Sequence, residues 1–352
     1  MKRIIIAFAL ILTLTAGLLA GCGRPDDPTI YGPGGSVQIP LRVVATIFPQ
    51  YDFVRQIAGD LVELTMLLSP GAESHGFEPS PRDMVTMNSA DLLIYVGGHG
   101  DEWVAPILAS LDRPELRAVA LMDLVTVVEQ EIVEGMEVYH AHDHDHDAHD
   151  HHDDHDHHDD HDEHHDDHYH DDHDHEPHYD EHVWTCPQNA IAIVRALTEV
   201  LAELDPENAD AFRANSAAYI EELAELDAAF DDVVASAARR TVIFGDRFPF
   251  RYMMDTYGLT YFAAFSGCSA ETQASPVTIA FLIDKVLAED IPYVLTIEFS
   301  NRLIANVISE ATGAGQLEMH SAHTISHAEF EAGVTYIDVM LRNVETLRGA
   351  LN

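Results

Sequence analysis

Residues 140–178 consist almost wholly of histidine and aspartate, and they hold 18 of the chain's 24 histidines. Such a segment has no run of apolar side chains for a core, so we expect a disordered loop that interrupts the fold. Neutral imidazole is a strong zinc ligand, and aspartate adds oxygen ligands and negative potential. Many interchangeable ligands on one loop predict loose binding of several metal ions. The alternative is an acidic linker that contacts no metal.

The chain as a whole is strongly acidic. The chain has 61 Asp and Glu against 18 Lys and Arg, a formal net charge of −43. Such a surface repels nucleic acid and attracts cations. We therefore expect no nucleic-acid partner.

The N-terminus has the pattern of an export signal. Lys2 and Arg3 precede an apolar stretch at residues 4–19, and small residues then lead to Cys22. This arrangement resembles the lipobox of bacterial lipoproteins, which implies that residues 1–21 are removed and Cys22 is acylated. A signal anchor or transmembrane helix is the alternative, but the stretch is short for a span of about 20 residues.

These features predict an extracytoplasmic protein, held at the cell membrane only by its lipid. Residues 22–40 contain Pro, Gly and Asp without periodicity, which favours a flexible tether. No later stretch has the length and apolarity of a membrane span.

Short apolar strands alternate with helical patterns on both sides of the His/Asp tract. This alternation predicts an α/β fold with mainly parallel sheets flanked by helices. Strands are expected at 41–47, 62–68, 91–96, 241–244, 259–264 and 293–297, and helices at 51–58, 81–89, 187–204, 248–257, 275–289, 302–312 and 333–351.

A long helical pattern occupies residues 205–240. It starts at Asp205-Pro206, where proline suits the first helical position, and one side carries Phe212, Tyr219, Ile220, Leu223, Leu226, Phe230 and Val234. Because 352 residues exceed the size at which one core usually stops growing, we expect two lobes. The N-terminal lobe would span 41–204, the linking helix 205–240 and the C-terminal lobe 241–352.

Two cysteines, Cys186 and Cys268, remain after the lipidation site. An oxidising exterior permits a disulfide between them, and two buried free thiols are the equal alternative.

Three histidines outside the tract are candidates for a defined metal site. His75 lies in a Pro/Gly loop directly after a predicted strand, where α/β proteins gather ligands. His182 lies where the regular pattern resumes, and His320 follows a predicted strand. Each is also compatible with a surface or hydrogen-bonded histidine, and their separation in sequence does not show whether they meet.

Several stretches together resemble one family. They are residues 70–80 (Pro-Gly-Ala-Glu-Ser-His-Gly-Phe-Glu-Pro-Ser), 180–184 (Asp-Glu-His-Val-Trp), 257–259 (Tyr-Gly-Leu) and 311–314 (Ala-Thr-Gly-Ala). Over roughly residues 43–351 the chain is similar to the zinc/manganese class of metal-binding solute-binding proteins of ABC importers. The His-rich loop matches the zinc branch. The resemblance implies two α/β lobes joined by one long, rigid helix, with the metal between the lobes.

The resemblance also implies a ligand set. It places the first two ligands at His75 and His182 and the fourth at His320. The third family ligand is usually a His or Glu, but Gly245 stands at that position. Asp246 is the nearest substitute, and a helix N-cap is its alternative role. Three imidazoles and one oxygen suit tetrahedral zinc.

Four further residues are kept as possible ligands: Glu271, Glu298, His99 and His323.

The expected function is capture of Zn²⁺ in the cleft and its delivery to a membrane permease, without catalysis. A zinc-buffering or storage lipoprotein, or an adhesin of that kind, is the main alternative. A zinc-dependent hydrolase is disfavoured because the chain has no His-Glu-x-x-His segment. The sequence leaves manganese or nickel open as cargo.

Overall fold

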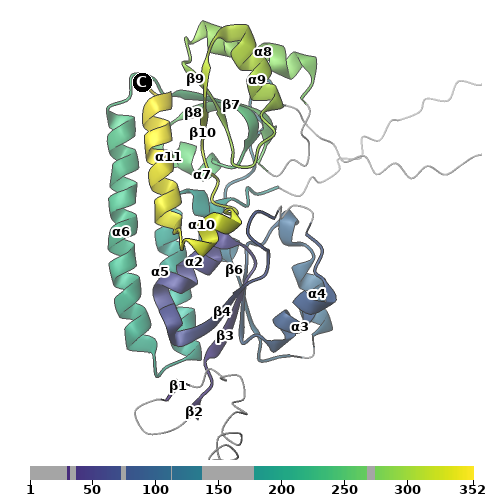
Figure 1. The fold of residues 1–352 in the computed structure, drawn as a ribbon, viewed down its shortest axis with the longest axis vertical. Coiled ribbons are helices and arrows are strands. Elements are labelled where there is room, and N and C mark those ends of the chain that lie inside the picture. Colours follow the sequence, from purple (N-terminus) through teal and green to yellow (C-terminus); the bar gives the residue numbers. More distant parts are fainter. Residues whose placement is uncertain (1–29, 32–36, 73–76, 112, 137–177, 268–273) are drawn as a thin grey trace, which may run out of the picture.

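The computed structural model describes residues 30–31, 37–72, 77–111, 113–136, 178–267 and 274–352 (Figure 1). Cys22, His75, Cys268 and Glu271 lie outside these residues, as do positions 140–177 of the His/Asp tract. The expectations for those positions therefore remain proposals.

The N-terminal lobe contains a parallel four-stranded sheet in the order β4-β3-β5-β6. Its central strands are buried on both faces, as the continuous apolar runs predict. The sheet comprises β3 (Leu41–Ala45), β4 (Val62–Met66), β5 (Leu92–Tyr95) and β6 (Arg117–Ala120). Its helices are α2 (Phe48–Ala58), α3 (Pro81–Ser89) and α4 (Val104–Ser110).

Two of these elements, α4 and β6, were not expected from the sequence. Both are short, and β6 carries Arg117 and two alanines, so it lacks the β-branched run of the other strands. The structure places it at the sheet edge beside β5.

The C-terminal lobe repeats this architecture with a parallel sheet in the order β10-β9-β7-β8. Its strands are β7 (Thr241–Phe248), β8 (Thr260–Ser266), β9 (Tyr293–Thr296) and β10 (Gly315–Glu318). Its helices are α7 (Arg251–Tyr257), α8 (Pro276–Ala288) and α9 (Leu303–Thr312).

Strand β7 is longer than expected. The sequence predicts a strand that ends at 244 and a helix from 248, whereas the strand continues to Phe248 and the helix begins at Arg251. The register against β8 shifts between Phe244 and Arg247, so the strand passes through an irregularity and then resumes pairing. Gly and Asp within this stretch are poor strand formers, and pairing with β8 overrides their preference.

Three long helices lie together on one side of the molecule, and α6 extends along both lobes (Figure 1). They are α5 (Pro187–Leu204), α6 (Ala209–Ala235) and α11 (Tyr336–Ala350). Helix α6 has 27 residues and is shorter than the predicted 205–240, because residues 206–208 form a turn before it. Its predicted apolar face is buried, with Ile220 partly so. The largest core cluster joins this face to residues of both sheets. The expected two-lobed α/β fold with a long linking helix is confirmed.

A second connection ties the C-terminal helix to the N-terminal lobe. The Asp52 carboxylate on α2 accepts a hydrogen bond from the Tyr336 backbone nitrogen at 2.6 Å. Arg55 donates to the Val334 carbonyl at 3.0 Å and also pairs with Asp52. The short helix α10 (His327–Glu331) lies next to this junction (Figure 1). The first turn of α11 is thus anchored to the N-terminal lobe, and nearer its other end the Thr346 hydroxyl donates to the Glu318 carbonyl of β10 at 2.8 Å.

Part of the expected tether pairs as strands. Strand β1 (Ile30–Tyr31) lies antiparallel to β2 (Val37–Gln38) within residues 22–40. Among the helices of the described residues, none is both long enough and apolar enough to cross a bilayer.

The Cys186 thiol is buried and free, and it contacts the Thr256 hydroxyl at 3.3 Å. Burial raises the pKa of this thiol. Of the two alternatives for Cys186, the structure shows the buried free thiol.

Candidate metal centre

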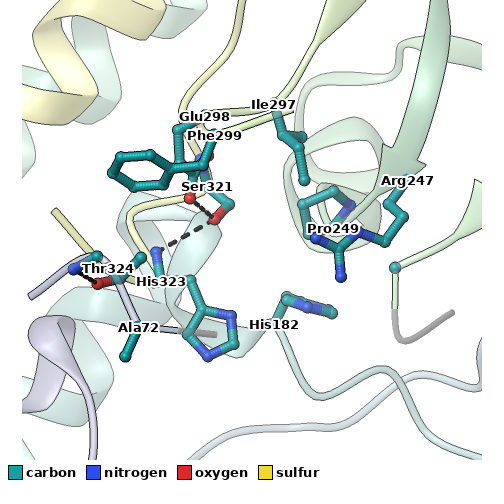
Figure 2. A pocket seen from close by; sticks show the side chains of 12 residues that line it. Ala72, His182, Arg247, Pro249, Ile297, Glu298, Phe299, Ser321, His323 and Thr324 are labelled. Atoms are coloured by element: carbon teal, nitrogen blue, oxygen red, sulfur yellow. Dashed lines mark hydrogen bonds between the residues drawn. The ribbon is translucent and has the colours of Figure 1, made fainter. Parts of the chain in front are cut away.

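The candidate pocket lies where the carboxyl ends of the two sheets face each other. Parallel sheets gather ligands at this edge. The segment after β4 supplies one wall, and the segments that end β7, β8, β9 and β10 supply the other (Figure 2). The cavity measures about 170 Å³ and is lined by Gly71, Ala72, His182, Arg247, Pro249, Gly267, Ile297, Glu298, Phe299, Ser321, His323 and Thr324.

The segment that carries His182 is held in the interior. It enters the short 3₁₀ turn Val183–Thr185 and is buried from Asp180 to Cys186. The Tyr252 hydroxyl donates to the Asp180 carbonyl at 2.6 Å, and the Tyr336 hydroxyl donates to the Trp184 carbonyl at 2.6 Å. These bonds come from α7 and α11, so two separate helices fix the place of this segment.

The His182 imidazole is oriented by a buried carboxylate. Its Nδ1 lies 3.0 Å from Oδ1 of Asp180, and both side chains are almost fully buried. A carboxylate partner holds the proton on Nδ1, which makes Nε2 the nitrogen with the lone pair. The ring also packs on Gly267, where a Cβ would lie 2.8 Å from Cε1 of His182. Metal-binding histidines commonly have such a carboxylate partner on the nitrogen that does not bind the metal.

His323 faces His182 across the pocket. The two ring centroids are 6.2 Å apart and the rings are nearly perpendicular (Figure 2). With a Zn–N bond of about 2.1 Å, two imidazoles on a tetrahedral ion have centroids roughly 5–6 Å apart. The observed separation is close to that value. Trp184 packs against both rings, at 5.5 Å from His182 and 5.3 Å from His323.

Glu298 adds a buried carboxylate to the same pocket. It follows β9 and is only 8% exposed. Its oxygens accept hydrogen bonds from the Ser321 backbone nitrogen at 2.7 Å and from the Ser321 hydroxyl (Figure 2). These bonds hold a negative charge beside two imidazoles, which favours a bound cation.

His320 does not line this pocket itself, but its Nδ1 lies 3.7 Å from Oε2 of the pocket residue Glu298. Asn343 on α11 clamps its backbone, with bonds of 2.7 Å to both the nitrogen and the carbonyl oxygen. Nδ1 of His320 accepts from the Ala322 backbone nitrogen at 3.0 Å. Ala322 has a φ of 59°, and this tight turn sends His323 toward the pocket while His320 stays buried in the lobe.

Asp246, the expected substitute ligand, is also absent from the described pocket lining. Its Oδ1 accepts from the Arg247 backbone nitrogen at 2.8 Å, and its Oδ2 lies 3.5 Å from the Ile297 nitrogen. It therefore ties β7 to the end of β9, and it is not the helix N-cap of the alternative role because it lies within β7. The side chain that β7 does place in the pocket is Arg247, which sequence reasoning gave no role.

Gly245 occupies a position where a side chain has no room. A Cβ there would lie 2.7 Å from Cα and 2.9 Å from the backbone nitrogen of Ala305 on α9. Cβ atoms in proteins do not approach backbone atoms this closely, so only glycine fits here. The backbones of β7 and α9 are in direct contact at this point. The packing of β7 against α9 therefore excludes a ligand side chain at position 245.

Of the other possible ligands, His99 is exposed and pairs with Glu102 at 2.7 Å. His75 and Glu271 lie outside the described residues. Within the described part of the chain, no group of three or more His, Cys, Asp or Glu side chains is arranged to hold a metal ion. Among the described residues, His182 and His323 alone would therefore not complete a metal site.

Two parallel α/β lobes, linked by long helices and with a ligand-lined pocket where their strands end, define a solute-binding protein of the rigid-helix type. The sequence assigns the family. The chain belongs to the family described as zinc-uptake complex component A, periplasmic, whose sequence profile matches residues 43–350. This family consists of transport components and not of enzymes.

Individual relatives agree with that assignment. The zinc-binding lipoprotein AdcA of Streptococcus pneumoniae is 28% identical over 309 residues, which cover 88% of this chain but 55% of AdcA. This chain thus spans about half the length of that relative. The high-affinity zinc uptake system protein ZnuA of Bacillus subtilis is 25% identical over 337 residues, with 95% and 94% of the two chains covered.

The fold is also shared with solved structures. The Zn(II)-bound ZnuA-like domain of Streptococcus pneumoniae AdcA superposes with a TM-score of 0.67 at 24% identity, covering 89% of this chain and 99% of that domain. The periplasmic zinc-binding protein TroA of Treponema pallidum gives 0.67 at 21% identity, covering 89% and 99%. At these identities the comparison speaks for the fold.

Proposed function

We propose that this protein captures Zn²⁺ in the pocket between its two sheets and delivers it to the permease of an ABC importer. The observation that carries the proposal is the pair His182 and His323. One imidazole is oriented by a buried carboxylate, and the other faces it at a separation suited to a shared ion. Family membership supports the transport role.

The proposed ligands are His182, His323 and His75. The loop that leads to His75 reaches the pocket, since Gly71 and Ala72 line it. The Gly71 nitrogen donates to the Thr324 hydroxyl at 2.8 Å, which ties this loop to the segment carrying His323 (Figure 2). Three imidazoles favour zinc over manganese or calcium, which require more oxygen ligands. Glu298 supplies compensating charge.

Location and partners follow from the sequence. Lipidation at Cys22 would hold the protein on the extracytoplasmic face of the membrane beside its permease. AdcA, the relative at 28% identity, is named a lipoprotein. The His/Asp tract at 140–178 would bind further zinc loosely and raise its concentration near the pocket.

Calorimetry of zinc binding to the full chain tests the proposal. We expect one tight site and a class of weak sites. Deleting residues 140–178 should remove the weak class and keep the tight site, whereas His182→Ala should remove the tight site and keep the weak class. Loss of the tight site on deletion of the tract, with no effect of His182→Ala, would contradict the proposed site.

A further inference from the structure

We propose that residues 128–136 form a strap that leaves the N-terminal lobe and is clamped on the C-terminal lobe, and that Glu131 is its positioning residue for His182. Opening of this strap sets how fast zinc enters and leaves the pocket. The inference rests on the proposed zinc capture and adds what controls the exchange of the ion.

The strap binds three elements of the C-terminal lobe, although it follows β6 of the N-terminal lobe in the chain. The Glu131 carboxylate pairs with Arg251 of α7 and accepts a hydrogen bond from the Tyr261 hydroxyl of β8 at 3.1 Å. Farther along the strap, Oε2 of Glu134 lies 3.7 Å from Nζ of Lys285 on α8. These contacts join the two lobes in addition to the long helices.

The strap also holds the segment that carries His182. Val128 and Asp180 belong to two antiparallel segments, and the Asp180 nitrogen donates to the Val128 carbonyl at 2.9 Å. The Tyr252 hydroxyl of α7 binds both segments, because it accepts from the Val128 nitrogen at 3.4 Å and donates to the Asp180 carbonyl at 2.6 Å. Since the Asp180 carboxylate orients the His182 imidazole, displacement of the strap moves the proposed ligand.

The part of the strap around Glu131 is held less firmly than the helix layer. The Glu131 side chain is 48% exposed, so solvent screens its ion pair with Arg251. Val133 and Met136 pack against the core and keep the end of the strap attached. The face of α6 that joins the lobes is buried in the same apolar cluster. Screened polar contacts open at a lower free-energy cost than a buried core, so the strap opens while the helices still join the lobes.

Loosening such a strap changes rates more than affinity. As long as the closed state predominates, nearly all molecules are competent to hold zinc, and the dissociation constant stays close to that of the natural chain. More frequent opening speeds the entry and the exit of the ion together. Loss of a ligand instead weakens the affinity, mainly through faster exit.

Stopped-flow transfer of zinc between the full chain and a chromogenic chelator measures both rates. The kinetic phase that His182→Ala lacks belongs to the pocket and not to zinc on the His/Asp tract. In Glu131→Gln this phase should be about two- to fivefold faster for release and for association, because a partly exposed ion pair is lost, with less than about a twofold change in Kd. Glu129→Gln removes the same charge from an exposed side chain of the strap and is the matched control, with no change expected. Adding Arg251→Gln to Glu131→Gln should have no further effect.

Hydrogen exchange reports the opening of the strap without relying on release rates. The Gln130 nitrogen donates to the His178 carbonyl at 2.7 Å, and the Asp180 nitrogen is bonded to the opposite segment, so both amides exchange when the strap opens. Zinc should slow this exchange in the natural chain and not in His182→Ala. Glu131→Gln should speed it and leave the exchange of the α6 amides unchanged.

The outcomes separate the two proposals. If a His182-dependent zinc phase exists but Glu131→Gln leaves its rates unchanged, the strap does not act on the pocket and this inference is overturned, while zinc capture stands. Faster release with weaker affinity and unchanged association would make Glu131 a contributor to affinity and would also overturn the strap. Exchange at Gln130 and Asp180 that zinc does not slow would show that the strap and the pocket are uncoupled. Absence of any His182-dependent zinc phase would contradict the proposed function itself.

Discussion

Asp180 and His182 form a buried carboxylate–imidazole pair, with Oδ1 and Nδ1 3.0 Å apart. The same carboxylate oxygen accepts from the His182 backbone nitrogen at 2.8 Å. The Asp180 side chain thus fixes both the backbone and the ring orientation of His182, the proposed zinc ligand. The pair lies in a segment that α7 and α11 fix through tyrosine hydroxyls.

Asp180→Asn should weaken zinc binding at the tight site by about 10–100-fold, because the amide holds the proton on Nδ1 less strongly and lowers the basicity of Nε2. Competition with a chromogenic chelator measures the effect. Asp255→Asn, which removes a surface partner of Arg251, is the control and should leave the affinity unchanged. An unaltered affinity in Asp180→Asn would show that the pair has no part in metal binding.

His323→Ala and His320→Ala should have opposite effects. We expect His323→Ala to weaken the tight zinc site strongly, since it removes a ligand. His320→Ala should leave zinc affinity nearly intact and lower the free energy of unfolding by about 1 kcal/mol, because the Ala322 nitrogen loses its acceptor. Zinc titration and urea denaturation of both variants decide between the two roles. The reverse pattern would return the ligand role to His320.

Gly245→Ala should destabilise the protein by about 1–3 kcal/mol, because the added Cβ would collide with the backbone of Ala305. Gly245→His should likewise fail to create a tighter zinc site. Urea denaturation measures the stability change. Gly349→Ala on α11 is the control: its nearest neighbour is the flexible Leu317 side chain at 3.3 Å, and alanine favours a helix, so no loss is expected.

Glu329 should contribute to the pH dependence of stability. Burial raises its pKa, but hydrogen bonds from Ser326 and the ion pair with Arg342 outweigh this and lower the pKa to about 2. A depressed folded-state pKa gives stability that is present above the ordinary value of 4.5 and is lost as the pH falls toward about 2. The side chain is 26% exposed, so solvent screening limits the contribution to on the order of 1 kcal/mol.

Glu329→Gln should therefore be less stable than the natural chain at pH 7, and the difference should shrink between about pH 4.5 and 2. Urea denaturation across this range measures it. Glu345→Gln removes a glutamate that is 70% exposed and should leave the pH profile unchanged. If the difference in stability between Glu329→Gln and the natural chain stays constant down to pH 2, ionisation of Glu329 does not contribute to the pH dependence of folding.

Local sequence determined most of the elements. The capping residue Ser80 and the apolar periodicity located α3 as predicted, and the buried face of α6 was readable from its spacing. These features depend on nearby residues alone, so propensity and period suffice to predict them. The sequence predicted the end of β7 wrongly, at 244 instead of Phe248, because pairing with β8 decides where this strand ends and local preference does not.

The sequence also predicts the chemistry of the site, since His182 lies in a recognisable stretch and Gly245 stands where the family has a ligand. Tertiary structure alone decided which side chains share the pocket. The family resemblance placed a ligand at His320 and kept His323 only as a further possibility. The backbone around Ala322, whose φ is positive, instead leaves His320 buried and places His323 in the pocket with His182. Arg247 gave no sequence signal of a role, because an arginine next to an aspartate is ordinary until the fold places it beside two imidazoles. Ligand convergence depends on the path of the backbone between distant segments, and that path is fixed by packing over the whole chain.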